Sequence, residues 1–160
     1  MQNWPLLSIL IWLPILGGAL VLALGERRAQ AARWVSLAVA LAVFLISLSL
    51  FTGFDAAATA MQFVERREWI PAYDIQYHLG ADGISVALII LTTLTTALVL
   101  VGAWTAIDRR VNQYYAAMLV LEGLMIGVFS AVDALLFYVF FEGMLIPMFI
   151  IIGVWGGPRR

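Results

Sequence analysis

The feature that most constrains this chain is a series of five apolar stretches separated by polar segments. They cover residues 6–24, 34–51, 84–106, 114–130 and 134–154, and only two of the 19 charged side chains lie within them. A helix needs roughly 20 apolar residues to cross the hydrocarbon of a bilayer, which each stretch approximately supplies. We therefore predict an all-α integral membrane protein, a bundle of five transmembrane helices forming a single membrane domain over residues 1–160.

The composition excludes several other classes of protein. Hydrophobic residues make up 64% of the chain and charged residues 12%, so a water-soluble globular fold is excluded. Cysteine is absent and there is one histidine, which excludes iron–sulfur ligation, thiolate zinc sites and a haem held by two histidines of this chain. No phosphate-binding loop, nucleophile motif or nucleic-acid patch is present. We expect this chain to hold no cofactor and no metal, and to bind membrane lipid but no nucleic acid.

The arginines predict the orientation, because basic residues near the ends of spans stay on the cytoplasmic side. Seven arginines belong to one side of the predicted bundle and two to the other, so the N-terminus is predicted outside and the C-terminus inside. The interfacial tryptophans agree, with Trp4 at the outer end and Trp34, Trp104 and Trp155 at the inner end. The larger set of arginines is Arg27, Arg28, Arg33, Arg109, Arg110, Arg159 and Arg160, and the smaller is Arg66 and Arg67.

One long segment, residues 52–83, is predicted to be an external loop. Apolar and polar residues alternate over residues 73–79, which is the period of a short amphipathic strand. Residues 63–70 are a candidate partner strand, with Pro71 near the turn. The sequence thus predicts a short β-hairpin in the external loop.

Glu142 is the leading candidate for a functional side chain, because it lies near the middle of the fifth stretch. An ionised carboxylate at that depth costs about 3 kcal/mol or more, so it must be protonated, paired or hydrated. Pro147 follows five residues later and cannot donate a backbone N–H, which leaves the carbonyl of Gly143 without its helical partner. The alternative is a structural role, with a neutral Glu142 bonded between helices.

Glu122 lies near the middle of the fourth stretch and is the second candidate for proton transfer. The link between the fourth and fifth stretches is short, so Glu122 and Glu142 are predicted at similar depth, where they could approach one another. Repulsion and lost hydration would then favour a protonated carboxyl. The alternative is that Glu122 specifies helix packing, because the nearby Gly123 and Gly127 have the spacing that lets helices approach closely.

Two further groups of polar residues have simpler interpretations. Asp133 is predicted to cap the start of the fifth helix. Mid-depth threonines in the third stretch either line a hydrated path or bond back to carbonyls of their own helix. The threonines are Thr92, Thr93, Thr95 and Thr96.

Two motifs carry a family resemblance. The run Phe140-Phe141-Glu142-Gly143-Met144-Leu145-Ile146-Pro147-Met148, continuing to Trp155-Gly156, resembles the fifth-span signature of subunit M of proton-translocating NADH:quinone oxidoreductase, the respiratory complex I. The run Leu79-Gly80-Ala81-Asp82-Gly83-Ile84-Ser85 resembles the stretch that precedes the third span in that antiporter-like family. Family members have more spans, so this chain resembles an N-terminal portion.

The resemblance implies a function and a set of partners. Glu142 would be the fifth-span glutamate that takes part in proton translocation, paired with a lysine on a broken helix beyond residue 160 or in another chain. Flavin, iron–sulfur clusters and quinone would belong to other subunits of complex I. The location would be the bacterial cytoplasmic (inner) membrane or an equivalent energy-coupling membrane.

Two other hypotheses remain open from the sequence. A multisubunit cation/proton antiporter or a membrane-bound hydrogenase has subunits with the same acidic motif. A purely structural membrane protein with neutral buried acids is the third hypothesis.

Overall fold

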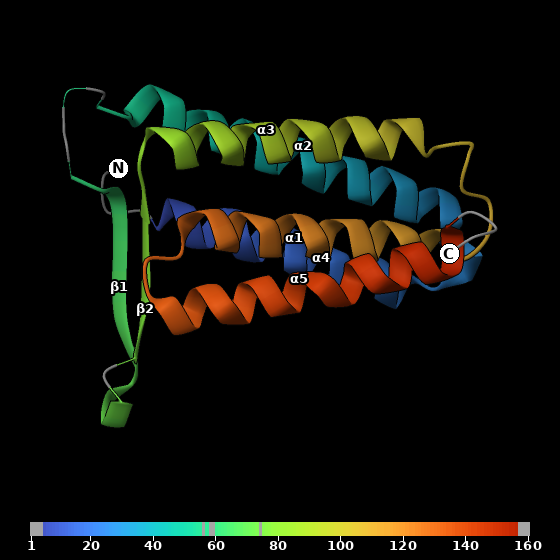
Figure 1. Ribbon diagram of the computed structural model, residues 1–160. Helices are drawn as coiled ribbons and strands as arrows, with labels where there is room; N and C mark the ends of the chain where they lie inside the picture. Colours follow the sequence, from blue (N-terminus) through green and yellow to red (C-terminus); the bar gives the residue numbers. More distant parts are fainter. Residues whose placement is uncertain (1–4, 56, 58–59, 74, 157–160) are drawn as a thin grey trace.

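The computed structural model describes residues 5–55, 57, 60–73 and 75–156. It contains five long helices and a two-stranded sheet, as the sequence predicts. Within the described residues, all five helices are long and apolar enough to cross a membrane. They run side by side, and the strands lie across one end of the bundle (Figure 1). The helices are α1 Leu6–Leu24, α2 Ala29–Gly53, α3 Gly83–Gly102, α4 Val111–Ser130 and α5 Ala134–Trp155.

Several helix bounds differ from the apolar stretches. α2 begins at Ala29, five residues before the predicted span, because its first turn is rich in alanine and other good helix formers. α3 ends at Gly102, four residues early, and the chain then turns before Arg110. Hydropathy indicates the part of a helix that lies in hydrocarbon. The helix itself can continue into the membrane interface or end earlier, at a residue that disfavours helix.

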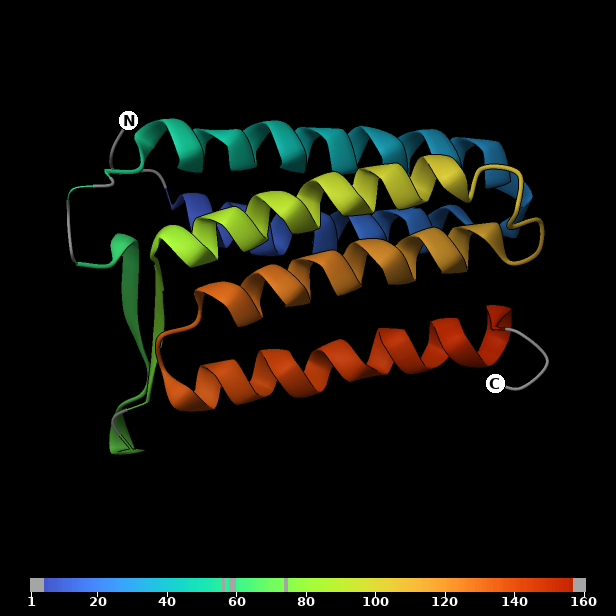
Figure 2. The same ribbon diagram turned by 45° about the horizontal axis from the view of Figure 1, so that its top comes forward.

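α4 packs against the other four helices and α5 lies at the edge of the bundle (Figure 2). Two glycines of α4 allow this close packing. A Cβ on Gly123 would lie 2.4 Å from the carbonyl oxygen of Ile11 in α1, and one on Gly127 would lie 2.7 Å from the ring of Phe140 in α5. The small-residue spacing expected from the sequence is therefore used on two different neighbours.

The predicted hairpin is present in the external loop. β1 Gln62–Ile70 pairs antiparallel with β2 Ile75–Ala81, and the short 3-10 helix η2 Pro71–Tyr73 lies at the turn. Glu65 in β1 accepts hydrogen bonds from the backbone N–H and the hydroxyl of Ser8 at the start of α1. Val132, between α4 and α5, donates its N–H to the carbonyl of His78 in β2 at 2.9 Å. The hairpin is thus bonded to two helix ends.

The opposite end of the bundle gathers arginine and aromatic side chains. Arg33 donates to the carbonyl of Ile107, and Arg109 donates to that of Val154. The Trp34 and Trp104 rings meet edge to face at 5.0 Å, and the Tyr114 and Trp155 rings do so at 5.2 Å. The two ends therefore differ as the sidedness argument requires, although Trp4, Arg159 and Arg160 lie outside the described residues. Inside and outside remain a prediction.

Candidate functional site

The turn between α4 and α5 places Glu122 and Glu142 at matching heights. Glu122 lies eight residues before Ser130, the last residue of α4, and Glu142 lies eight residues after Ala134, the first residue of α5. At about 1.5 Å per residue, each carboxyl-bearing residue is about 12 Å from its helix end. Depth therefore does not distinguish the two acids, and their surroundings do.

Asp133 sets the start of α5 in this arrangement. Its side chain accepts from the backbone N–H groups of Leu135 and Leu136, as a helix cap does. It also accepts from the N–H of Gln76 in β2 at 3.2 Å, a bond that the sequence did not predict. The Gln76 bond, followed by the Leu136 and Leu135 bonds and the nearby His78, holds the pKa of Asp133 below its ordinary value. Asp133 is thus a structural joint, as expected, and it also fixes the hairpin.

Glu122 is enclosed by the bundle. The residue is 1% exposed, and neither carboxyl oxygen has a hydrogen-bond partner among the described residues. It lines a cavity of about 270 Å³ between α3 and α4. Glu122 is the only ionisable side chain in this lining. The other lining residues are Leu88, Leu91, Thr92, Thr95, Thr96, Val99, Met118, Leu121, Met125 and Phe129.

Three of the four threonines of α3, Thr92, Thr93 and Thr96, donate hydrogen bonds to carbonyls of their own helix. Thr92 donates to the carbonyl of Leu88 at 2.7 Å, and Thr96 donates to that of Thr92 at 2.9 Å. Thr93 faces the other way, where its hydroxyl lies 2.9 Å from that of Ser47 in α2. The two interpretations left open by the sequence are therefore not exclusive, because Thr92 and Thr96 make these bonds and also line the Glu122 cavity.

Glu142 has the opposite surroundings, on the exposed face of α5. The buried residues of α5 are Leu136, Phe140 and Pro147, which form a stripe towards the rest of the bundle. Glu142 is about 200° around the helix from Phe140 and therefore points away from α4. It lies in an open hollow of about 420 Å³ whose lining residues, apart from Glu142, are Gly143, Leu145, Ile146, Phe149 and Ile150, all from α5.

The structure does not bring the two glutamates together. Glu122 and Glu142 line different cavities, one within the bundle and one on its outer face. The approach that the sequence left open fails because equal depth does not fix the rotation of each helix. Within this chain, the two carboxyls are therefore separate sites.

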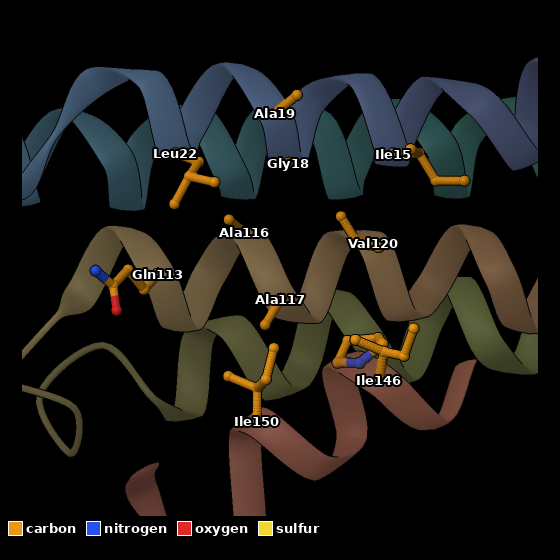
Figure 3. A pocket seen from close by; sticks show the side chains of 11 residues that line it. Ile15, Gly18, Ala19, Leu22, Gln113, Ala116, Ala117, Val120, Ile146 and Ile150 are labelled. Carbon is orange, nitrogen blue, oxygen red and sulfur yellow. The ribbon is translucent and has the colours of Figure 1, made fainter. Parts of the chain in front are cut away.

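A third cavity helps to define the inner side of α5. It is an apolar groove of about 460 Å³ between α1, α4 and α5, and Pro147 is part of its lining. Figure 3 shows Ile150 of α5 pointing towards Ala117 of α4 across this groove, whereas Val120 of α4 points towards α1. Gln113 is its one side chain with an amide, and none is ionisable. The groove therefore has no group suited to proton transfer.

The residues described do not form a metal site. No group of three or more His, Cys, Asp or Glu side chains that could hold a metal ion occurs in the described part of the chain.

The sequence analysis did not identify the cap of α3, where Asp82 accepts from the N–H of Ser85 at 2.8 Å. That bond, with the hydroxyl of Ser85, lowers the pKa of Asp82. An aspartate directly before an apolar run is the signal that marks this cap.

Comparisons with known proteins were consistent with one another. No protein-family model matches the chain. NADH-quinone oxidoreductase subunit M of Rhodobacter capsulatus is 48% identical over 164 residues, covering 100% of this chain and 31% of that protein. NADH-ubiquinone oxidoreductase chain 4 of Arabidopsis thaliana is 44% identical over 154 residues, covering 96% of this chain and 31% of that protein.

One solved structure is also similar to this chain. A chain in respiratory complex I from Thermus thermophilus with bound NADH superposes with a TM-score of 0.78 and 28% sequence identity, covering 93% of this chain and 29% of that chain. The present chain spans about a third of the length of these relatives. It is a multi-pass membrane protein and, over its whole length, a homologue of the subunit M and chain 4 proteins of NADH-quinone oxidoreductase.

Proposed function

We propose that this chain is an N-terminal portion of a proton-translocating membrane subunit of NADH:quinone oxidoreductase, and that Glu142 takes up and releases the translocated proton. Similarity to subunit M over the whole chain supports the assembly. The observation that carries the role of Glu142 is its place on the outward face of α5, midway along a helix that lies at the edge of the bundle. Only 17% of the most apolar 18-residue part of α5 is buried, against 44% in α4.

An outward-facing carboxyl in the hydrocarbon region either stays protonated or needs a partner when it ionises. An unpaired carboxylate there costs about 3 kcal/mol on insertion scales. All nine basic residues of the chain are arginines outside the five predicted spans, so none of them lies at the depth of Glu142. The partner must come from a segment beyond this sequence or from another subunit.

A cation in such a partner would make Glu142 switchable. A positive group within about 4 to 6 Å stabilises the ionised form of a carboxyl, and its withdrawal favours the protonated form. The family resemblance implies a lysine on a broken helix in this role. Glu142 would then load a proton when the lysine withdraws and release it when the lysine returns.

Pro147 gives the outward face of α5 a second polar feature. The proline has no N–H, so the carbonyl of Gly143 lacks its usual intrahelical donor. Gly143 also lines the hollow that contains Glu142. A free carbonyl beside the acid offers an acceptor for water or for a protonated partner, which suits proton entry to the carboxyl.

Electron transfer is assigned to other subunits in this proposal. The chain has no cysteine and one histidine, and we expect flavin, iron–sulfur clusters and quinone to be held elsewhere in the complex. The chain would act in the bacterial cytoplasmic membrane or its equivalent, next to other membrane subunits of the complex. Its part in catalysis is the coupling of quinone reduction to proton movement.

The test is proton uptake by inverted membrane vesicles that oxidise NADH. We expect Glu142→Gln to lower proton translocation by about 100-fold or more, the range expected when a positioned proton-transfer group is removed. Glu142→Asp should retain more activity because it keeps a carboxyl. Phe149→Leu changes the same outward face without touching the acid and serves as the control.

Three results would decide against the proposal. Normal proton uptake in Glu142→Gln would leave a structural role for the acid. An equal loss in Phe149→Leu would show that the face matters for packing and that the carboxyl has no special part. Copurification of the chain with a nickel–iron hydrogenase or with antiporter subunits alone would favour the alternative assemblies.

A further inference from the structure

The cavity between α3 and α4 combines a buried acid with hydroxyl groups at the middle of both helices. Glu122 is the twelfth residue of the 20 in α4, and Thr92 and Thr96 are the tenth and fourteenth of the 20 in α3. All three residues are at least nine-tenths buried, with exposures of 1% for Glu122 and 7% for each threonine. Their common cavity measures about 270 Å³. The polar groups are thus concentrated in one place within an otherwise apolar lining.

The side chains that line this cavity offer more hydrogen-bond acceptors than donors. The hydroxyl protons of Thr92 and Thr96 are given to helix carbonyls, so these oxygens face other groups as acceptors. Both oxygens of Glu122 lack a partner among the described residues. A buried carboxyl left without hydrogen bonds destabilises the folded chain. A molecule that donates hydrogen bonds is therefore required.

Water fits this requirement better than a second side chain. One buried water needs roughly 10–15 Å³ of such space and two to four polar partners. The cavity of about 270 Å³ exceeds that volume and offers the carboxyl oxygens of Glu122 and the hydroxyls of Thr92 and Thr96.

We propose that this cavity is a water-filled proton-binding site, in which Glu122 holds a proton and exchanges it with the enclosed water. In the exchange, the O–H bond of the carboxyl breaks as a water oxygen accepts the proton, and a proton from water forms the new O–H bond. No other reactant is consumed. No other ionisable side chain lines the cavity, and the site does not depend on the role of Glu142.

The first experiment is infrared spectroscopy of the intact complex carrying wild-type chain or Glu122→Gln. The wild-type spectrum should contain one carbonyl band of a protonated carboxyl that the variant lacks. That band should shift as fast as the buffer is exchanged for deuterated buffer. Failure to find a band that depends on Glu122, or a band that stays unshifted in deuterated buffer, would overturn the proposal.

Two threonines of the same helix supply matched variants. Thr92→Val removes an acceptor from the cavity and should move the Glu122 band. Thr93→Val, one residue away, removes a hydroxyl that bonds towards Ser47 and does not line the cavity. It should leave the band in place. An equal response to both changes would mean that the band reports general packing of α3 and would count against the site.

A second measurement keeps the test open if Glu122→Gln fails to assemble. Cysteine reacts through its thiolate, which forms only where water reaches it. The chain has no cysteine, so Met125→Cys and Ile126→Cys can be compared directly. Met125 lines the cavity, whereas Ile126 is fully buried in the apolar core. A small water-soluble thiol reagent should modify position 125 and spare position 126, and an unreactive Met125→Cys would overturn the proposal.

Discussion

Glu122 and Glu142 occupy the same height in neighbouring helices, and their surroundings are opposite. Glu122 is enclosed between α3 and α4, in a cavity that the chain builds by itself. Glu142 lies on the outer face of α5, in an open hollow lined only by its own helix. This chain therefore encloses one of the two acids and leaves the other on its outer face.

The difference follows from the rotation of each helix. On α4 the buried positions recur every three or four residues and include Tyr115, Leu119, Glu122 and Ile126. On α5 the buried positions include Leu136 and Phe140, and Glu142 falls on the opposite side. The rotation of a helix about its axis thus decides whether an acid at mid-depth is buried. Two acids on helices joined by a short turn can therefore lie in different surroundings.

The two helices also differ in how tightly they fit their neighbours. Gly123 follows Glu122 and meets the backbone of α1, whereas Gly143 follows Glu142 and would place a Cβ 3.6 Å from a methyl group of Leu124. The surroundings of Gly123 are therefore closely packed and those of Gly143 are loose. This contrast predicts unequal responses to matched substitutions.

The largest expected effect concerns the orientation of the bundle, which decides the side of the membrane that each end faces. We expect an impermeant thiol reagent to label Ala72→Cys on intact cells and to leave Gln30→Cys unlabelled. Both residues are exposed, Ala72 at the tip of the hairpin and Gln30 at the arginine end of α2. Labelling of position 30 from outside would refute the orientation, and detergent-opened cells should label at both positions.

Much of this architecture could be predicted because a bilayer imposes simple rules. A helix that crosses hydrocarbon must be apolar and about 20 residues long, so five helices are evident in the sequence. The alternation of residues 73–79 likewise predicts a strand, which the structure places two residues later at Ile75–Ala81, and an aspartate before an apolar run predicts the cap at Asp133. These are local signals, and the structure confirms them.

The surroundings of the acids could not be predicted in the same way. In a soluble protein, the separation of apolar and polar residues shows which face of a helix is buried. That separation is weak here, because lipid-facing and protein-facing residues are both apolar. The rotation of α4 and α5 is set by shape, as in the contact of Gly127 with the ring of Phe140. The cavity beside Glu122 depends on α3 as well, which is separated from α4 by the loop after Gly102. Long-range packing of this kind leaves no periodic trace in the sequence.

Paired glycine substitutions should sharpen the contrast in packing. Gly123→Ala would place a Cβ 2.4 Å from the carbonyl oxygen of Ile11, a backbone atom that cannot rotate away. We expect a loss of about 1–3 kcal/mol in the free energy of unfolding, as is usual for overpacking. Gly143→Ala meets only ordinary contacts and should be neutral or stabilising by up to about 1 kcal/mol, since alanine favours helix.

The measurement is denaturant or thermal unfolding in detergent, with Gly102→Ala as a control. A Cβ at Gly102 would meet nothing within 4 Å, so this variant should be near wild type. Equal destabilisation by Gly123→Ala and Gly143→Ala would contradict the difference in fit around the two glycines.

The smallest expected effect concerns Asp133, which caps the start of α5 and lies in the turn between the helices of the two acids. Its pKa is lowered below the ordinary value of 3.8, chiefly by the N–H of Gln76. A carboxyl with a lowered pKa in the folded state stabilises that state above its ordinary pKa, and this contribution is lost as the pH falls through the lowered value. We therefore expect the anchoring of α5 to the hairpin to weaken only below about pH 4.

Amide hydrogen exchange can detect this loss at single residues. In the wild type, the protection factor of the Gln76 amide should fall as the pH is lowered. In Asp133→Asn it should be independent of pH, because the asparagine side-chain oxygen still accepts but does not titrate in this range. The Ser85 amide, which bonds to Asp82, should keep its pH dependence in both proteins. Because Asp133 caps the start of α5, acid should disturb the helix that carries Glu142 before it disturbs the enclosed Glu122. Protection of Gln76 that stays constant in the wild type through this pH range would show that Asp133 is not what holds the hairpin to α5.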